Sequence, residues 1–285
     1  MAMFAVLMWA LNYPAIRYVL PYYSPGSIAI LRIFISSIFL IVVAAIKKIR
    51  LPEKKHLPRI VLCGFIGIFL FNVFLNVGAS YVASGVGSFI INSSPVFTLI
   101  MSRFILKEVV RPACWFGIII SFCGLMTVMM SQVAGFSINV GVLILLLAAF
   151  STSGYNVILR SLLKTYTAFE ATTYAVVSST VFFLVFIPDA VRDISANPPM
   201  IASFFIVQMG IFPAGLAYLA WGFALAKAEK TAHATVFLYL TPFIAAIIGY
   251  LWLRESIYLL SMVGGAVIIG GMVLTNTLGK SKNKT

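Results

Sequence analysis

Long apolar runs alternate with short polar interruptions along the whole chain. A helix needs roughly 20 apolar residues to cross the hydrocarbon core of a bilayer, and the runs are about that long. Proline, glycine or charged residues occupy most of the gaps, and these residue types typically end helices. We therefore predict ten transmembrane helices, over residues 2–20, 26–46, 58–78, 82–104, 112–131, 139–159, 169–187, 200–222, 231–252 and 258–278.

One stretch of this pattern occurs twice. Residues 79–124 align with residues 226–271 without a gap, at a constant offset of 147. Seven of the 46 aligned positions are identical, which chance similarity between apolar helices could produce, but the identities include structurally demanding residues. Among them are Pro95 with Pro242, Gly117 with Gly264, and Gly124 with Gly271. Because an odd number of spans separates the copies, we predict an inverted repeat, which is typical of transporters.

Composition restricts the class of protein further. Apolar residues make up 62% of the chain and charged residues 9%, and a soluble protein of this length could not bury so much apolar surface. The net charge of +13 does not indicate a nucleic-acid-binding protein, because the charges form short clusters between apolar runs. The three cysteines lack metal or disulfide spacing, so we expect them to pack as apolar side chains; they are Cys63, Cys114 and Cys123.

The charge clusters predict an orientation. On one side of the predicted bilayer lie 16 of the 20 lysines and arginines, in the segments 47–59, 103–111, 160–164, 227–230 and 280–284. The connections on the other side carry only Arg192 and Arg254. Cytoplasmic loops are enriched in lysine and arginine, so we expect both termini to be cytoplasmic.

The fourth and ninth predicted helices carry matching polar stripes. Residues at i, i+4, i+8 and i+11 share one helix face; they are Ser84, Ser88, Asn92 and Pro95 in one helix and Thr231, Thr235, Tyr239 and Pro242 in the other. Each proline cannot donate to the carbonyl four residues before it, so the carbonyls of Ile91 and Leu238 are expected to face protein or a watery cavity. The stripes predict either two bent helices lining a substrate path or simple helix packing.

Other polar and aromatic side chains fall at membrane depth. They are Trp9 and Asn12, Asn72 and Asn76, Tyr155 and Asn156, and Tyr218 and Trp221. A buried amide is costly unless it is hydrogen-bonded, so we expect these groups to face the bundle interior. Either substrate binding or contacts with neighbouring helices would explain them.

Few charges lie inside the predicted spans. Arg32 is a candidate for binding a substrate carboxylate or an acidic partner such as Asp189 or Asp193, because an intramembrane charge indicates function. Glu170 is expected in the first turn of its helix, where the helix dipole favours a carboxylate. In Lys107-Glu108, and in the matching Arg254-Glu255, the base is expected to end one helix and the acid to begin the next.

No pattern in the sequence indicates an enzyme. We find no phosphate-binding loop, no acid–base pair within a candidate site and no cluster of metal ligands. We therefore expect neither catalytic residues nor a metal or cofactor, and we do not expect an ATP-driven pump.

The repeated segments resemble the EamA family of the drug/metabolite transporter superfamily. The matching patterns are SSPVFTLI and LKE within 79–124, LTPFIAAI and LRE within 226–271, and the opening LMWALNYPAIRYVL with SPGSIAILR, which includes Trp9, Asn12, Pro25 and Arg32. The resemblance covers essentially the whole chain. It implies an all-α membrane protein of ten helices in two inverted five-helix repeats, residues 1–131 and 132–285, around a central cavity.

The predicted function is secondary transport of a small organic metabolite across the bacterial inner membrane, by alternating access of the repeats with hinges at Pro95 and Pro242. Export of an amino acid or related compound is favoured, with uptake or exchange as alternatives and protons as a candidate coupling ion. The chain is expected to act as a monomer or homodimer in the lipid bilayer. A membrane scaffold or receptor without transport activity, a lipid flippase and a channel are the alternatives from other classes.

Overall fold

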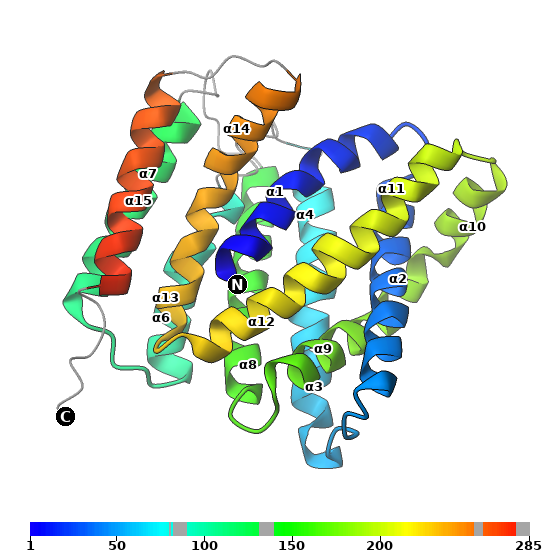
Figure 1. The fold of residues 1–285 in the computed structure, drawn as a ribbon, viewed down its shortest axis with the longest axis horizontal. Coiled ribbons are helices and arrows are strands. Elements are labelled where there is room, and N and C mark those ends of the chain that lie inside the picture. The colour runs from blue at the N-terminus through cyan, green and yellow to red at the C-terminus, as the bar shows by residue number, and fades with distance from the viewer. Residues whose placement is uncertain (80, 82–89, 131–139, 254–258, 278–285) are drawn as a thin grey trace. The chain divides into compact units, whose positions relative to one another are not determined.

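A computed structural model describes residues 1–79, 81, 90–130, 140–253 and 259–277, and every regular element in these residues is a helix (Figure 1). Five helical segments are long and apolar enough to cross a membrane: Pro25–Ile46, Lys54–Gly78, Val140–Leu162, Ala168–Ser195 and Met200–Lys227. Five shorter apolar helices are Ala2–Asn12, Ser94–Ile105, Pro112–Thr127, Thr231–Ile244 and Met262–Thr277. The predicted all-helical architecture is confirmed for this part of the chain, and its helices suit a membrane protein.

The chain divides into two compact units, and the first combines residues Met1–Asn72 with Ile158–Ala226. Its principal helices are α1 (Ala2–Val19), α2 (Pro25–Ile46), α3 (Leu57–Gly64), α9 (Ala168–Phe183), α10 (Ile187–Ser195), α11 (Met200–Ile211) and α12 (Ala217–Lys227). Short 3₁₀ segments η1 (Lys54–His56) and η3 (Leu184–Phe186) and π-helices η2 (Phe65–Leu70) and η4 (Phe212–Leu216) connect them. Helix α2 packs against α9, α10 and α11, and α1 packs against α11.

The second unit combines residues Val73–Val157 with Lys227–Thr285. It contains most of α4 (Phe71–Ala79) and α8 (Val140–Leu162), with α6 (Ser94–Ile105), α7 (Pro112–Met130), α13 (Thr231–Thr235), the 3₁₀ segment η5 (Val236–Tyr239), α14 (Leu240–Leu253) and α15 (Leu259–Thr277). Helices α7 and α15 lie side by side, and α13 packs against α6. Each unit therefore draws on both halves of the sequence, and the division into repeats at residue 131 stays a prediction.

Local signals in the sequence explain where two of the helices begin. The Ser24 hydroxyl accepts the backbone N–H of Ser27 at the start of α2, where Pro25 occupies a position that needs no N–H donor. At the start of α9, Thr167 and Glu170 form a capping box, in which each side chain accepts the backbone N–H of the other residue. The predicted place of Glu170 in the first turn is confirmed.

The predicted spans agree with the helices over most of the described residues. Two differ. The segment predicted as 169–187 continues through α10 to Ser195, because Pro188 lies in the first turn of α10, where a proline is tolerated. Of the segment predicted as 82–104, residues 82–89 lie outside the described residues, and α6 begins at Ser94.

Two glycine pairs bring α7 and α15 into close contact. A Cβ atom built on Gly124 would lie 2.7 Å from the carbonyl oxygen of Gly264, and one built on Gly117 would lie 2.7 Å from that of Gly271. These distances are too short for a side chain, so glycine is required for the backbones to approach. The residue numbers of the contacting positions rise along α7 and fall along α15, so the two helices are antiparallel.

A hydrogen bond joins the same helices between the glycine pairs. The Ser121 hydroxyl donates to the carbonyl oxygen of Ile268 at 3.2 Å. These two residues are 147 positions apart, which is the offset that relates the repeated segments. Equivalent positions of the two sequence copies therefore meet each other here.

Candidate functional site

Three aromatic rings from α1 and α12 meet in the first unit. The Trp9 ring contacts Tyr218 with centroids 5.7 Å apart in a T-shaped arrangement, and Trp221 with centroids 5.4 Å apart. Trp221 is almost completely buried. The spacing of Tyr218 and Trp221 predicts that they share a helix face, and the structure places that face against Trp9. Such rings offer a flat, adaptable surface to an organic solute.

The π-helix η4 lies next to this cluster and is held by side chains from two other helices. The indole N–H of Trp9 donates to the Pro213 carbonyl at 3.1 Å, and the Ser36 hydroxyl donates to the Ala214 carbonyl at 2.8 Å. A π-helix interrupts the regular pattern of backbone hydrogen bonds and often occurs at functional sites. Side chains of α1 and α2 thus satisfy carbonyls of the irregular turn, which is required at membrane depth.

A second π-helix, η2, occupies the equivalent place in the first half of the sequence. It begins at Phe65 and η4 begins at Phe212, which again differ by 147 positions. The Asn72 amide donates to the carbonyl of Ile68 within η2 at 2.6 Å. In this structure Asn72 therefore supports the helix backbone, whereas Asn76, expected on the same face, is exposed.

Arg32 lies on α2 and faces the aromatic cluster. Its side chain is partly exposed, but its Nε atom is buried and has no hydrogen-bond partner among the described residues. The guanidinium interacts electrostatically with the hydroxyl of Tyr218 on α12. On α1, three residues after Trp9, the Asn12 Oδ1 atom is also buried and lacks a hydrogen-bond partner in the described part of the chain. The described residues of the first unit thus include an unpartnered donor on α2 and an unpartnered acceptor on α1.

The acidic partners suggested for Arg32 are wrong. Asp193 accepts hydrogen bonds from the backbone N–H of Ser24 at 2.6 Å, the Ser27 hydroxyl at 2.6 Å and Arg192 Nε at 3.1 Å. Asp189 lies 3.4 Å from Arg192 Nη2. Asp193 therefore joins the start of α2 to α10, Asp189 pairs with Arg192 within α10, and neither neutralises Arg32.

The helix before α6 is interrupted where the sequence predicts a bend. Asn92 and Ser93 form a turn, and Pro95 falls in the first turn of α6, so the proline begins a new helix. The Ile90 carbonyl accepts the backbone N–H of Ser93 at 3.2 Å and its hydroxyl at 2.5 Å. The Ser93 side chain thus satisfies a carbonyl that the break would leave open. Asn92 is buried at this break.

A matching interruption precedes α14. The chain tightens into η5, which ends at Tyr239, and α14 begins at Leu240 with Pro242 in its first turn. The Leu240 backbone N–H bonds to the carbonyls of Phe237 and Leu238. The Leu238 carbonyl, which Pro242 was expected to leave free, is thus contacted by the N–H of Leu240, whose 3₁₀ hydrogen bond is the one to Phe237. Asn92 and Tyr239 lie at equivalent breaks, one in a turn and one at the end of a 3₁₀ segment.

The remaining polar candidates of the second unit differ in their surroundings. Tyr239 is fully buried with its ring 6.4 Å from Phe122, and its hydroxyl has no hydrogen-bond partner within the described ranges. Tyr155 and Asn156 are buried on α8, and the Asn156 amide lies 3.4 Å from the Thr98 hydroxyl. Ser88, together with Ser84, lies outside the described residues.

Glu108 contacts the start of a helix in the other half of the sequence. Its carboxylate accepts the backbone N–H and the hydroxyl of Thr231, both at 3.0 Å, at the start of α13. Buried beyond this contact, the His233 Nε2 atom lies 3.3 Å from the Cys114 Sγ atom. Spacing along the chain could not reveal the Glu108 contact, because 123 positions separate the two residues. Arg254-Glu255, the matching pair, lies outside the described residues.

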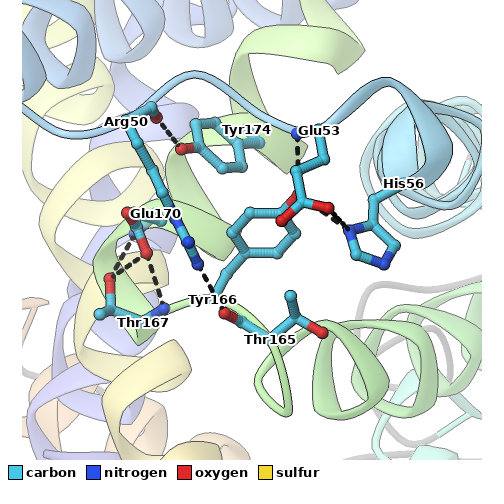
Figure 2. A network of polar contacts seen from close by, with 8 residues as sticks. All are labelled: Arg50, Glu53, His56, Thr165, Tyr166, Thr167, Glu170 and Tyr174. Carbon is cyan, nitrogen blue, oxygen red and sulfur yellow. Dashed lines mark hydrogen bonds and ion pairs between the residues drawn. The ribbon is translucent and has the colours of Figure 1, made fainter.

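Arg50 anchors a polar network at one end of the first unit (Figure 2). It lies 3.5 Å from the Glu170 carboxylate, donates to the Thr165 carbonyl at 2.8 Å and stacks over the Tyr166 ring at 5.2 Å. The Arg50 carbonyl accepts the hydroxyl of Tyr174. One side chain thus ties the segment after α2 to the corner between α8 and α9.

Tyr166 holds the other half of this network in Figure 2. Its hydroxyl accepts the backbone N–H of Glu53 at 3.0 Å and lies 3.0 Å from His56 Nδ1. A hydrogen bond from Lys55 lowers the pKa of the Glu53 carboxyl. The network is a structural clamp within one unit, and among its members the sequence indicated only Glu170.

Comparisons with known proteins agree with this fold. The model of the EamA-like transporter family matches residues 1–130 and 139–277. An uncharacterized transporter, YdfC, of Bacillus subtilis is 34% identical over 97% of this chain and 90% of its own. A probable terminal-alkyne amino-acid exporter of Streptantibioticus cattleyicolor is 32% identical over 97% of this chain and 93% of its own.

A solved crystal structure shares the fold at 17% sequence identity, with a TM-score of 0.80 over 98% of this chain and 96% of that one. The family match extends over both halves of the sequence, and relatives that share about a third of the residues are named as transporters rather than enzymes. The chain therefore belongs to the EamA-like transporter family and is a multi-pass membrane transporter of the drug/metabolite type, with a small solute as its substrate.

Proposed function

We propose that this protein is a secondary transporter that moves a small organic metabolite across the bacterial inner membrane by alternating access, with export of an amino acid or related compound favoured. The observation that carries the proposed mechanism is the reciprocal contact between α7 and α15. Gly117 of the first copy meets Gly271, while Gly264, its equivalent in the second copy, meets Gly124. When a two-fold axis relates two copies of a segment, each residue contacts the equivalent of its partner in this reciprocal way.

The direction of this axis supports an inverted repeat. The contacting helices are antiparallel, so the local two-fold axis runs across them, which for spanning helices means parallel to the membrane plane. Ser121 and Ile268, which are equivalent positions, lie next to the axis. The π-helices and the interrupted helices at the same offset of 147 add support. Two inverted repeats can pack against each other in two similar ways. The carrier can therefore open to either side of the membrane in turn.

The candidate substrate-binding residues fall into both units. The candidates of the first unit are Trp9, Asn12, Arg32, Tyr218 and Trp221. Those of the second unit are Asn92 and Tyr239 at the helix breaks, and Tyr155 and Asn156 on α8. Asn76 and Ser88 remain candidates, whereas the bond from Asn72 to its own helix favours a structural role. Pro95 and Pro242, each at the start of a new helix, are the proposed hinges.

Separate observations support the membrane orientation and the direction of transport in this proposal. The arrangement of lysine and arginine follows the positive-inside rule and supports cytoplasmic termini. The relative from Streptantibioticus cattleyicolor is named as a probable amino-acid exporter. Uptake and exchange of the same class of solute are the alternatives, and protons are the proposed coupling ion.

Counter-flow in proteoliposomes tests this proposal. Vesicles preloaded with an unlabelled pool of amino acids and organic acids should accumulate the matching labelled solute transiently, at a rate that saturates with concentration. Measurement at two internal pH values reports whether protons are coupled. Flux no greater than in protein-free vesicles would favour a scaffold or receptor, and flux without saturation or counter-flow would favour a channel.

A further inference from the structure

The first unit contains a cation that its own residues leave without a counter-charge. Arg32 lies seven residues into α2, its Nε atom is buried, and this atom has no hydrogen-bond partner in the described residues. A charged side chain at membrane depth is costly when no opposite charge lies beside it, even where part of the side chain is exposed. The cost is offset when an anion binds, and this makes an unpaired intramembrane arginine a candidate ligand site.

The acidic residues of the first unit that could neutralise Arg32 contact other groups. Asp189 and Asp193 bind Arg192 and the start of α2. Glu170 contacts Arg50 and caps α9. Within the described part of the first unit, Arg32 interacts with the Tyr218 hydroxyl, which is neutral at physiological pH and leaves the guanidinium charge uncompensated.

The surroundings of Arg32 define the rest of the ligand. Tyr218 belongs to the ring cluster with Trp9 and Trp221, so an anion bound at Arg32 would have aromatic surfaces near it. Indole and phenol rings bind apolar groups and planar rings through their faces. A guanidinium binds a carboxylate through two parallel hydrogen bonds, a geometry that a lysine ammonium does not reproduce.

We propose that Arg32 is the specificity-determining residue of this carrier and selects solutes that bear a carboxylate next to an apolar or aromatic group. This inference rests on the proposed transport function and deepens it by naming the substrate class. Neutral amides and organic cations of the same shape are selected against, because neither supplies the negative charge that Arg32 lacks among the described residues.

Ligand-dependent thermal unfolding in nanodiscs of phosphatidylcholine tests the site without requiring transport. Benzoate and benzamide have nearly the same shape and differ in charge, so they serve as the probes. A ligand that binds the folded state raises the unfolding midpoint in proportion to its occupancy. We expect benzoate at saturation to raise the midpoint of the wild-type protein by about 3 °C or more, and benzamide to leave it unchanged.

Variants assign the effect to Arg32. Arg32→Gln should abolish the benzoate shift, Arg32→Lys should retain part of it, and the exposed Arg59→Gln should retain all of it. Equal shifts with benzoate and benzamide, or a benzoate shift that survives in Arg32→Gln, would overturn the proposal. If Arg32→Gln does not fold, the wild-type protein still tests the proposal, because benzoate and benzamide must then differ in their effect on the unfolding midpoint.

An anionic lipid headgroup could supply the same charge, and a second set of nanodiscs separates the two sources. If phosphatidylglycerol raises the midpoint through Arg32 while benzoate in phosphatidylcholine does not, the site binds lipid and the solute proposal is wrong. The two proposals can also fail separately. A benzoate shift without counter-flow would contradict transport alone, whereas counter-flow restricted to uncharged solutes would contradict the role of Arg32 alone.

Discussion

Exchanging one of two neighbouring glycines on α15 tests the close contact that carries the proposed symmetry. A Cβ atom on Gly271 would lie 2.5 Å from the Gly117 carbonyl oxygen and 2.6 Å from the backbone nitrogen of Ser121. A Cβ atom on Gly270 would meet nothing within 4 Å. Gly271→Ala and Gly270→Ala therefore make the same chemical change on one helix, at a packed position and at an open one.

The difference between the two variants isolates the steric cost. Both should gain the same helix-propensity term, because alanine stabilises a helix interior by about 0.5–1 kcal/mol relative to glycine. Only Gly271→Ala must also separate two backbones, and overpacking of this kind costs about 1–3 kcal/mol. We expect Gly270→Ala to be as stable as the wild-type protein or slightly more stable, and Gly271→Ala to be less stable than Gly270→Ala by about 1–3 kcal/mol.

Thermal unfolding of the purified protein in one detergent measures this difference. At roughly 2–4 °C for each kcal/mol in proteins of this size, the midpoint of Gly271→Ala should lie on the order of 5 °C below that of Gly270→Ala. Equal midpoints, or a higher midpoint for Gly271→Ala, would show that α7 and α15 do not meet through these backbones. The reciprocal contact would then no longer support an inverted repeat.

Three further predictions concern the helix breaks, the capping acid and the network of Figure 2. Pro95→Ala and Pro242→Ala should reduce counter-flow more than they lower the unfolding midpoint, because each restores a donor at a proposed hinge; normal flux in both would refute this. Glu108→Ala should destabilise the protein by about 1–2 kcal/mol through loss of the cap on α13, and an unchanged unfolding midpoint would contradict it. Tyr166→Phe should cost about 1 kcal/mol for its lost hydroxyl contacts, whereas the exposed Tyr22→Phe serves as a control with no expected change.

Features that depend on neighbours along the chain could be predicted from the sequence. The start of α2 follows from Ser24 and Pro25, and the first turn of α9 from Thr167 and Glu170, because a cap joins residues only three positions apart. Helix periodicity likewise places Tyr218 and Trp221 on one helix face, because they are three positions apart. In each case the physical interaction is local.

Features that depend on which faces meet could not be predicted. The sequence predicts that Glu108 begins the helix that follows it, but its carboxylate contacts Thr231 at the start of another helix. It assigns two asparagines to one face, yet Asn72 bonds to its own helix backbone and Asn76 is exposed. A hydrophobic pattern identifies a buried face without identifying what buries it, since apolar contacts are not directional.

The sequence by itself determined that this chain is a helical membrane protein with a repeated segment, because apolar run length, charge placement and a constant offset are properties of the chain alone. The tertiary structure decided which helices and side chains contact one another. Only there does Trp9 meet the rings of α12, and only there do Ser121 and Ile268, which are 147 positions apart, touch. The structure alone also reveals that Arg32 Nε has no hydrogen-bond partner among the described residues. The reason is physical: membrane helices form independently, but close packing and the pairing of buried polar groups select their partners.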